Sequence, residues 1–213
     1  MQFQDLLELL SGEPLFETGL LLAGKTDADY VRVQLSRWTA QGRLLQLRRG
    51  LYVVAPPYRT REPHPFAVAN LLQRASYVSL HAALAYYGLI PEYVALTTSV
   101  STGRTRRWDT PLGSYAYRHI QPALFWGYRQ TEVYPGQHAY LATPEKALLD
   151  LVYLTPEADS PAYLRELRLQ NLDRLDLAAL VAGAQRAGSA KLERAAARVA
   201  LLAREEAEEY RTL

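Results

Sequence analysis

The stretch Asp27–Val54, DADYVRVQLSRWTAQGRLLQLRRGLYVV, decides how the N-terminal part of this chain folds. Its first half predicts a helix, because Val31, Leu35 and Trp38 recur at the i, i+4, i+7 spacing of one buried helical face. The pattern stops before Gly42. We therefore expect an amphipathic helix that packs its apolar stripe inward.

The second half of the stretch predicts a β-hairpin. Two apolar runs, 44–47 and 51–54, are typical of strands, and the basic turn 48–50 (RRG) separates them. Two prolines at 56–57 prevent the second strand from continuing. The tip of the hairpin therefore carries two arginines and a glycine.

Two shorter helices are expected before this stretch. Residues 3–10 repeat apolar side chains at helical spacing, and residues 15–23 can form a second helix that ends at Gly24. Thr26 or Asp27 is then the N-cap of the third helix. Three helices followed by a hairpin with a basic tip is the order of a winged helix-turn-helix.

Residues 1–58 are therefore expected to form a winged helix-turn-helix domain that binds double-stranded DNA. The outer face of the third helix would meet base edges, and the hairpin tip would lie against phosphates or in the minor groove. Winged-helix modules also bind proteins, so a protein-interaction adaptor stays open as an alternative. The candidate DNA-binding residues are Arg32, Val33, Ser36 and Arg37 on the helix, and Arg43, Arg48 and Arg49 around the hairpin.

The proline-rich segment 56–65 is expected to link this domain to a larger α+β domain, residues 64–213. Residues 95–141 are rich in Thr, Ser, Val and Tyr between turn residues, which predicts a central antiparallel sheet. Each part is expected to fold on its own. The helices expected in the larger domain are 66–73, 79–87, a run that opens at Thr143, and the C-terminal helices 162–169, 177–187 and 190–209.

Composition narrows the chemistry of this chain of 213 residues. It has no cysteine and four histidines, which excludes disulfides and thiolate chemistry and argues against a metal site. No paired catalytic motif is present, so we expect neither an enzyme nor a cofactor. The N-terminus resembles no leader and no apolar run reaches the roughly 20 residues of a membrane helix, so we expect a cytoplasmic protein without a membrane partner.

Arg104, Arg106 and Arg107 form a second basic cluster, in a turn between two expected strands. A basic turn of this kind binds phosphate or an acidic partner, or it is a solvated loop. Both interpretations stay open at this point. We retain the cluster as a candidate second site.

Other groupings have structural explanations. Thr143, Glu145 and Lys146 with Asp150 suggest an acid–lysine nuclease centre, but Glu145 and Lys146 point about 100° apart on a helix, and the Thr-Pro pair is a helix start. His81 is interpreted as a half-buried structural histidine. The tyrosines of the expected sheet are interpreted as half-buried core rather than a base-stacking platform: Tyr115, Tyr117, Tyr128, Tyr134 and Tyr140.

Three motifs in this order resemble a known family. They are RGLYV at 49–53, SLHAALAYYGLIP at 79–91 and ATPEKALLDL at 142–151. Together they resemble the AbiEi family of antitoxins, over nearly the whole chain. Members of that family belong to type IV toxin–antitoxin and phage-defence systems, in which the toxin is a nucleotidyltransferase.

The resemblance implies two roles for this chain. The winged domain would repress its own operon by binding inverted repeats, and the C-terminal domain would counteract the nucleotidyltransferase toxin without forming a stable complex with it. A stand-alone winged-helix transcriptional regulator is the alternative. A nucleic-acid-processing enzyme that uses the second domain is a further one.

Overall fold

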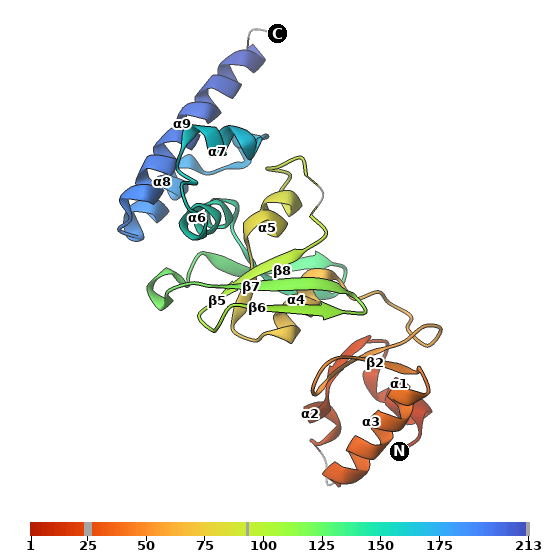
Figure 1. Cartoon of the computed structure of the whole chain (residues 1–213). Coiled ribbons are helices and arrows are strands. Elements are labelled where there is room, and N and C mark those ends of the chain that lie inside the picture. The colour runs from red at the N-terminus through yellow and green to blue at the C-terminus, as the bar shows by residue number, and fades with distance from the viewer. Residues whose placement is uncertain (24–26, 93, 212–213) are drawn as a thin grey trace.

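The structure is a computed structural model that describes residues 1–23, 27–92 and 94–211. It is an α+β chain in which a small N-terminal module precedes a larger domain (Figure 1). The expected helix end at Gly24 and the alternative cap at Thr26 lie outside the described residues.

The N-terminal module combines short helices with a small antiparallel sheet. Its strands lie in the order β1-β3-β2, so the last strand in the chain is the central one. Leu15 and Leu45, from the two outer strands, both pair with Val53. The elements in chain order are α1 (Phe3–Leu10), β1 (Leu15–Glu17), α2 (Thr18–Leu21), α3 (Ala28–Ala40), β2 (Leu44–Arg48) and β3 (Leu51–Val54).

The prediction of a single helix over 15–23 is wrong, because residues 15–17 form strand β1. Backbone hydrogen bonds hold this strand against β3 at both ends, from the Val54 N–H to the Pro14 carbonyl and from the Thr18 N–H to the Gly50 carbonyl, each at 2.9 Å. These partners are more than 30 residues away in sequence. Apolar periodicity in so short a run cannot separate strand from helix, and the distant strand decides the outcome.

Helix α3 forms where the sequence predicts it. The Asp27 side chain caps its first turn by accepting a hydrogen bond from the Asp29 N–H at 2.8 Å. The three apolar residues that predicted the helix are all buried, and the Trp38 ring meets Phe3 of α1 edge-on with the ring centroids 5.4 Å apart. This packing turns the opposite face of α3 outward.

The larger domain is built on a six-stranded sheet in the order β6-β7-β5-β4-β9-β8. Its helices follow the expected segments closely. The strands are β4 (Ser76–Val78), β5 (Thr97–Ser101), β6 (Arg106–Thr110), β7 (Gly113–His119), β8 (Tyr128–Tyr134) and β9 (Gln137–Ala142). The helices are α4 (Pro65–Leu72), α5 (Leu80–Tyr86), α6 (Pro144–Leu154), α7 (Pro161–Glu166), α8 (Leu177–Arg186) and α9 (Ala190–Arg211), with 3₁₀ turns at Pro122–Leu124 and Leu172–Arg174.

The expectation of an antiparallel sheet needs correction, because the sheet is mixed. β5 pairs with β7 in parallel, and β4 pairs with β9 in parallel. The central strand β4 has only three residues, all buried, so it shows no alternation of polar and apolar side chains and gives no strand signal. Without β4, the sequence offers only neighbouring strands that can pair as hairpins.

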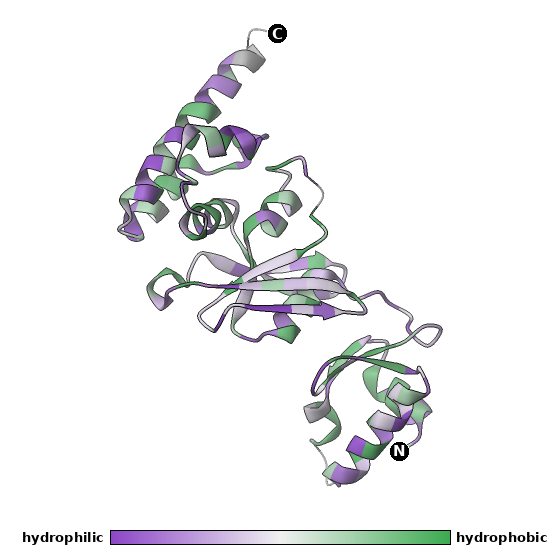
Figure 2. Ribbon diagram, in the orientation of Figure 1, coloured by the Kyte–Doolittle hydropathy of each residue, from purple (hydrophilic) through white to green (hydrophobic). Residues whose placement is uncertain are grey.

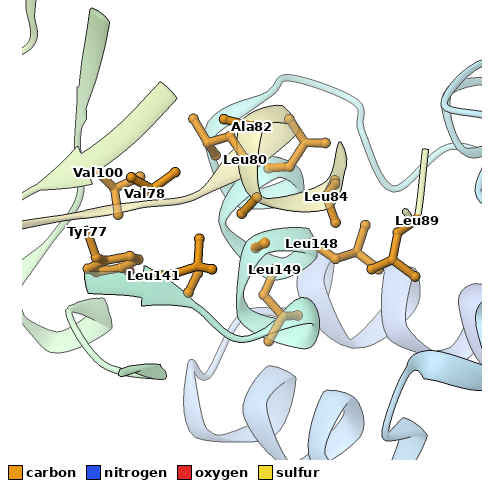
Figure 3. Packing of buried hydrophobic residues seen from close by; sticks show 14 of the residues in the cluster. Tyr77, Val78, Leu80, Ala82, Leu84, Leu89, Val100, Leu141, Leu148 and Leu149 are labelled. Carbon is orange, nitrogen blue, oxygen red and sulfur yellow. The ribbon is translucent and has the colours of Figure 1, made fainter. Parts of the chain in front are cut away.

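Helices cover both faces of this sheet. On one face the Tyr77 hydroxyl reaches α6, and on the other the Tyr117 hydroxyl donates to the carbonyl of Ala69 in α4. In Figure 1, α5 and α6 lie above the sheet, and α8 and α9 lie beyond α6. Figure 3 shows the core running from Tyr77 and Leu141 on the sheet to Leu148 on α6.

The two parts of the chain have separate hydrophobic clusters, but apolar residues of the hairpin cross the boundary between them. Leu47, Leu51 and Val53 of the hairpin belong to the cluster of the larger domain and not to that of the module. The hairpin ribbon is accordingly mostly hydrophobic in Figure 2. Arg61 in the linker donates to the Pro135 carbonyl at 2.7 Å. The module therefore rests against the larger domain.

Candidate nucleic-acid interface

The outer face of α3 is exposed as the sequence predicts. Arg32, Val33, Ser36 and Arg37 are all exposed, and even the apolar Val33 keeps 62% of its surface in solvent. In Figure 1, α3 lies on the side of the module that faces away from the larger domain. Nothing in the described part of the chain covers this face.

A hollow of about 610 Å³ lies between α3 and the hairpin. Arg32 and Ser36 line it from the helix, and Arg49 lines it from the hairpin tip. Three of the residues expected to bind DNA thus surround one concave surface, although they come from two segments of the chain. Val33 and Arg37 extend the exposed face of α3 outside the hollow.

The cations on this surface are free to bind an anion. Arg32 pairs with Asp29 at 2.7 Å, but both side chains are largely exposed, so water and salt screen the pair and a phosphate can replace the carboxylate. Among the residues that the structure describes, neither Arg37 nor Arg49 takes part in an ion pair. Gly50 beside Arg49 has φ +80°, which keeps the tip narrow.

Arg48 does not lie at the tip as expected. Its guanidinium turns back, donating to the Glu17 carboxylate at 2.8 Å and to the Leu71 carbonyl of α4 at 2.9 Å. Sequence reasoning missed this role because both partners are distant in the chain. Arg48 therefore joins the hairpin to the larger domain, and Arg49 alone supplies the charge at the tip.

Arg43 is also separated from the other candidates. Its guanidinium lies over the Phe3 ring of α1, 5.3 Å from the ring centroid. It does not line the hollow between α3 and the hairpin. A contact with α1 explains this position, so we no longer count Arg43 among the candidate DNA-binding residues.

Glu17 is a central acidic residue that the sequence did not single out. Its carboxylate accepts hydrogen bonds from Arg48 and from Arg74, which follows α4. The Arg74 guanidinium, followed by that of Arg48, holds the pKa of Glu17 below its usual value, against the opposing effect of burial. Glu17 thus stays ionised and links β1, the hairpin and the larger domain.

The second basic cluster was expected in a turn, but only Arg104 lies there, because Arg106 and Arg107 begin strand β6. The two strand residues have different surroundings. Arg107 pairs with Asp109 at 3.2 Å, and hydrogen bonds from Ser114 and then from Arg107 lower the pKa of the Asp109 carboxyl. Arg106 instead lies over the Trp108 ring, 5.2 Å from its centroid. Arg107 is therefore neutralised locally and is no longer a strong candidate for a second site.

A buried ion pair lies in the larger domain where the sequence predicted only a helix start. Thr143 caps α6 as expected, but Lys146 and Asp150, one helical turn apart, are 2% and 1% exposed and bonded to each other. Asp150 also accepts hydrogen bonds from the Tyr77 hydroxyl at 3.0 Å and the Ser79 hydroxyl at 2.8 Å. These bonds tie α6 to the sheet and to the start of α5.

Burial acts on both charges of this pair. It lowers the pKa of Lys146 and raises the pKa of Asp150, and the attraction between the two groups opposes both shifts. The Lys146 ammonium also lies over the Trp126 ring, 5.0 Å from its centroid. Because solvent does not reach either group, we interpret the pair as a structural centre.

The remaining sequence candidates have local roles. His81 is half-buried as expected, and burial lowers its pKa. Tyr115 and Tyr117 are core residues as expected, whereas Tyr134 and Tyr140 on the outer hairpin are exposed, contrary to expectation. Over residues 1–23, 27–92 and 94–211, no group of three metal-binding side chains is present, and no helix is long and apolar enough to cross a membrane.

Comparison with known proteins gives little further information. No family model matches the chain, and no curated protein matches it. Among solved structures, the crystal structure of the RV2827C protein from Mycobacterium tuberculosis is similar, with a TM-score of 0.49 and 16% sequence identity over 90% of this chain and 75% of that chain. A similarity of this size carries no information about function.

Proposed function

We propose that this chain is a transcriptional regulator whose N-terminal module is a winged helix-turn-helix that binds double-stranded DNA. The observation that carries the proposal is the hollow between α3 and the hairpin, which Arg32, Ser36 and Arg49 line together. The element order α1-β1-α2-α3-β2-β3, with β3 central in the sheet, agrees with a winged helix. The corrected strand β1 supports this assignment, because it supplies the third strand.

In this proposal α3 enters the major groove. Arg32 and Arg37 donate to guanine edges or phosphates, Ser36 donates or accepts, and Val33 packs against thymine methyl groups. Arg49 at the hairpin tip binds the sugar–phosphate backbone beside the groove. The helix therefore provides sequence preference, and the tip provides affinity that depends on salt.

Replacing Arg49 by alanine is expected to weaken binding to all duplexes by a similar factor. One lost phosphate contact lowers the slope of log affinity against log salt by about one unit. Fluorescence anisotropy of the full-length protein on labelled duplexes, over a series of salt concentrations, measures both quantities. Arg165→Ala on α7 removes an equal charge far from the module and is expected to leave the slope unchanged; equal effects of the two variants would contradict the proposal.

Antagonism of a nucleotidyltransferase toxin is the second part of the proposal, and the resemblance to AbiEi antitoxins supports it. The two roles are expected to separate in the double variant Arg37→Ala/Arg49→Ala, because both residues lie on the exposed surface of the module. Co-expression with a nucleotidyltransferase toxin of an AbiEi-type system, scored by growth and by a promoter reporter, should show lost repression with intact protection. If the wild type repressed the promoter but gave no protection against the toxin, the chain would be a stand-alone regulator.

A further inference from the structure

A second basic hollow, of about 370 Å³, lies at the turn between β5 and β6. Arg74, Arg104 and Arg106 line it together with the small residues of the turn. Arg104 and Arg106 belong to the cluster singled out in the sequence, whereas Arg74 reaches it from the end of α4. Three guanidinium groups thus surround one concave surface of the larger domain.

Little acidic charge balances these arginines. Of the three, Arg74 alone takes part in an ion pair within the described residues, and its partner Glu17 is shared with Arg48. Arg106 is held over the Trp108 ring, which orders the guanidinium without neutralising it. Arg48 and Arg74 therefore share one carboxylate, Arg104 and Arg106 have no ion pair among the described residues, and the surface keeps a positive potential.

This hollow is linked to the hairpin of the N-terminal module through Glu17. Glu17 binds Arg48 at the base of the hairpin tip and Arg74 at the edge of the hollow, so one carboxylate spans the boundary between the two parts. Arg49 lies next to Arg48 at the tip. We call the surface formed by Arg49, Arg74, Arg104 and Arg106 the basic strip; Arg48, held by Glu17 and the Leu71 carbonyl, joins its two ends.

We propose that the basic strip binds one continuous length of DNA backbone, so that the hollow of the larger domain holds phosphates beyond those contacted by the hairpin tip. This inference rests on the proposed function and extends its footprint. Arginine matches phosphate oxygens with paired N–H donors, and the hydroxyl of the exposed Thr102 beside the hollow can donate as well.

The composition of the strip favours DNA over an acidic protein. Stable protein interfaces have an apolar centre inside a polar rim. The segment TGRTRR, 102–107, which forms the turn after β5 and the first residues of β6, is exposed and polar throughout. An extended row of arginines that starts at the hairpin tip matches a regular line of phosphates better than a compact acidic patch.

The test uses the full-length double variant Arg104→Ala/Arg106→Ala with two duplexes. The shorter duplex spans the module's contacts only, and the longer one extends past the hairpin tip by about one helical turn. On the longer duplex, the salt slope of the variant is expected to fall by about two units, one for each lost phosphate contact. On the shorter duplex, the slope is expected to equal that of the wild type.

The control Arg165→Ala/Arg204→Ala removes the same charge from exposed positions on α7 and α9. Equal slopes for the two double variants on the longer duplex would overturn the basic strip. If Arg49→Ala still lowered the slope in that case, the proposed DNA-binding function would stand and the hollow would be assigned to another, acidic partner. A wild type without affinity for any duplex would overturn both. Thermal melting of each variant confirms that it is folded.

Discussion

Replacing Asp150 by alanine is expected to lower the free energy of unfolding by about 3–5 kcal/mol, because the Lys146 ammonium would be left buried without its partner. The hydroxyls of Tyr77 and Ser79 would lose their acceptor as well. Urea denaturation followed by circular dichroism measures the loss. Asp109→Ala, which removes an exposed carboxylate from β6, is the matched control and should change stability by roughly 0.5 kcal/mol or less.

A double variant distinguishes the charge pair from simple packing. Lys146→Met/Asp150→Leu removes both charges and keeps apolar volume, so it is expected to be more stable than Asp150→Ala alone. If the double variant were as unstable as the single one, the loss would come from packing and hydroxyl contacts. If Asp150→Ala lowered the free energy of unfolding no more than Asp109→Ala does, the Lys146–Asp150 pair would not be buried.

Replacing Trp38 by alanine is expected to cost about 3–5 kcal/mol and to unfold the N-terminal module. The indole is 3% exposed and packs against Phe3, whose ring also meets Tyr58 with centroids 5.0 Å apart. Hydrogen exchange resolves the effect by segment: protection should fall over 1–54 and persist in the six-stranded sheet. The affinity of the protein for DNA should fall together with the protection of the module.

Val33→Ala is the control for Trp38→Ala, because Val33 lies on the opposite, exposed face of the same helix. Its effect on stability is expected to be roughly 0.5 kcal/mol or less. A Trp38→Ala variant with native exchange protection and lost DNA binding would place the indole on the surface. That outcome would also reverse the faces assigned to α3.

The parts of the fold that the sequence predicts are those in which local pattern and burial agree. Helix α3 has its cap, its apolar stripe and its outer face within a single segment. The hairpin that follows it has its turn residues next to its strands. In both cases the information lies within a few residues, so periodicity and turn chemistry are enough.

The parts that were missed depend on partners far away in the chain. Strand β1 exists because β3 pairs with it, and β4 exists because β5 and β9 enclose it. The same holds for the charges. The sequence shows that Arg48 is an arginine at a turn, but only the fold brings Glu17 and the Leu71 carbonyl to it. The four-residue spacing of Lys146 and Asp150 is visible in sequence, whereas their burial is not.

The apolar back of the hairpin has a consequence for signalling. Because Leu51 belongs to the core of the larger domain while its neighbour Arg49 lines the proposed DNA surface, the hairpin is one element with two environments. A ligand that repositions α4 would change the affinity of the module for DNA, and by thermodynamic reciprocity DNA would change the affinity for that ligand by the same factor. Cutting the chain at the linker would abolish this coupling and leave an N-terminal fragment whose hairpin exposes apolar side chains that are prone to aggregate.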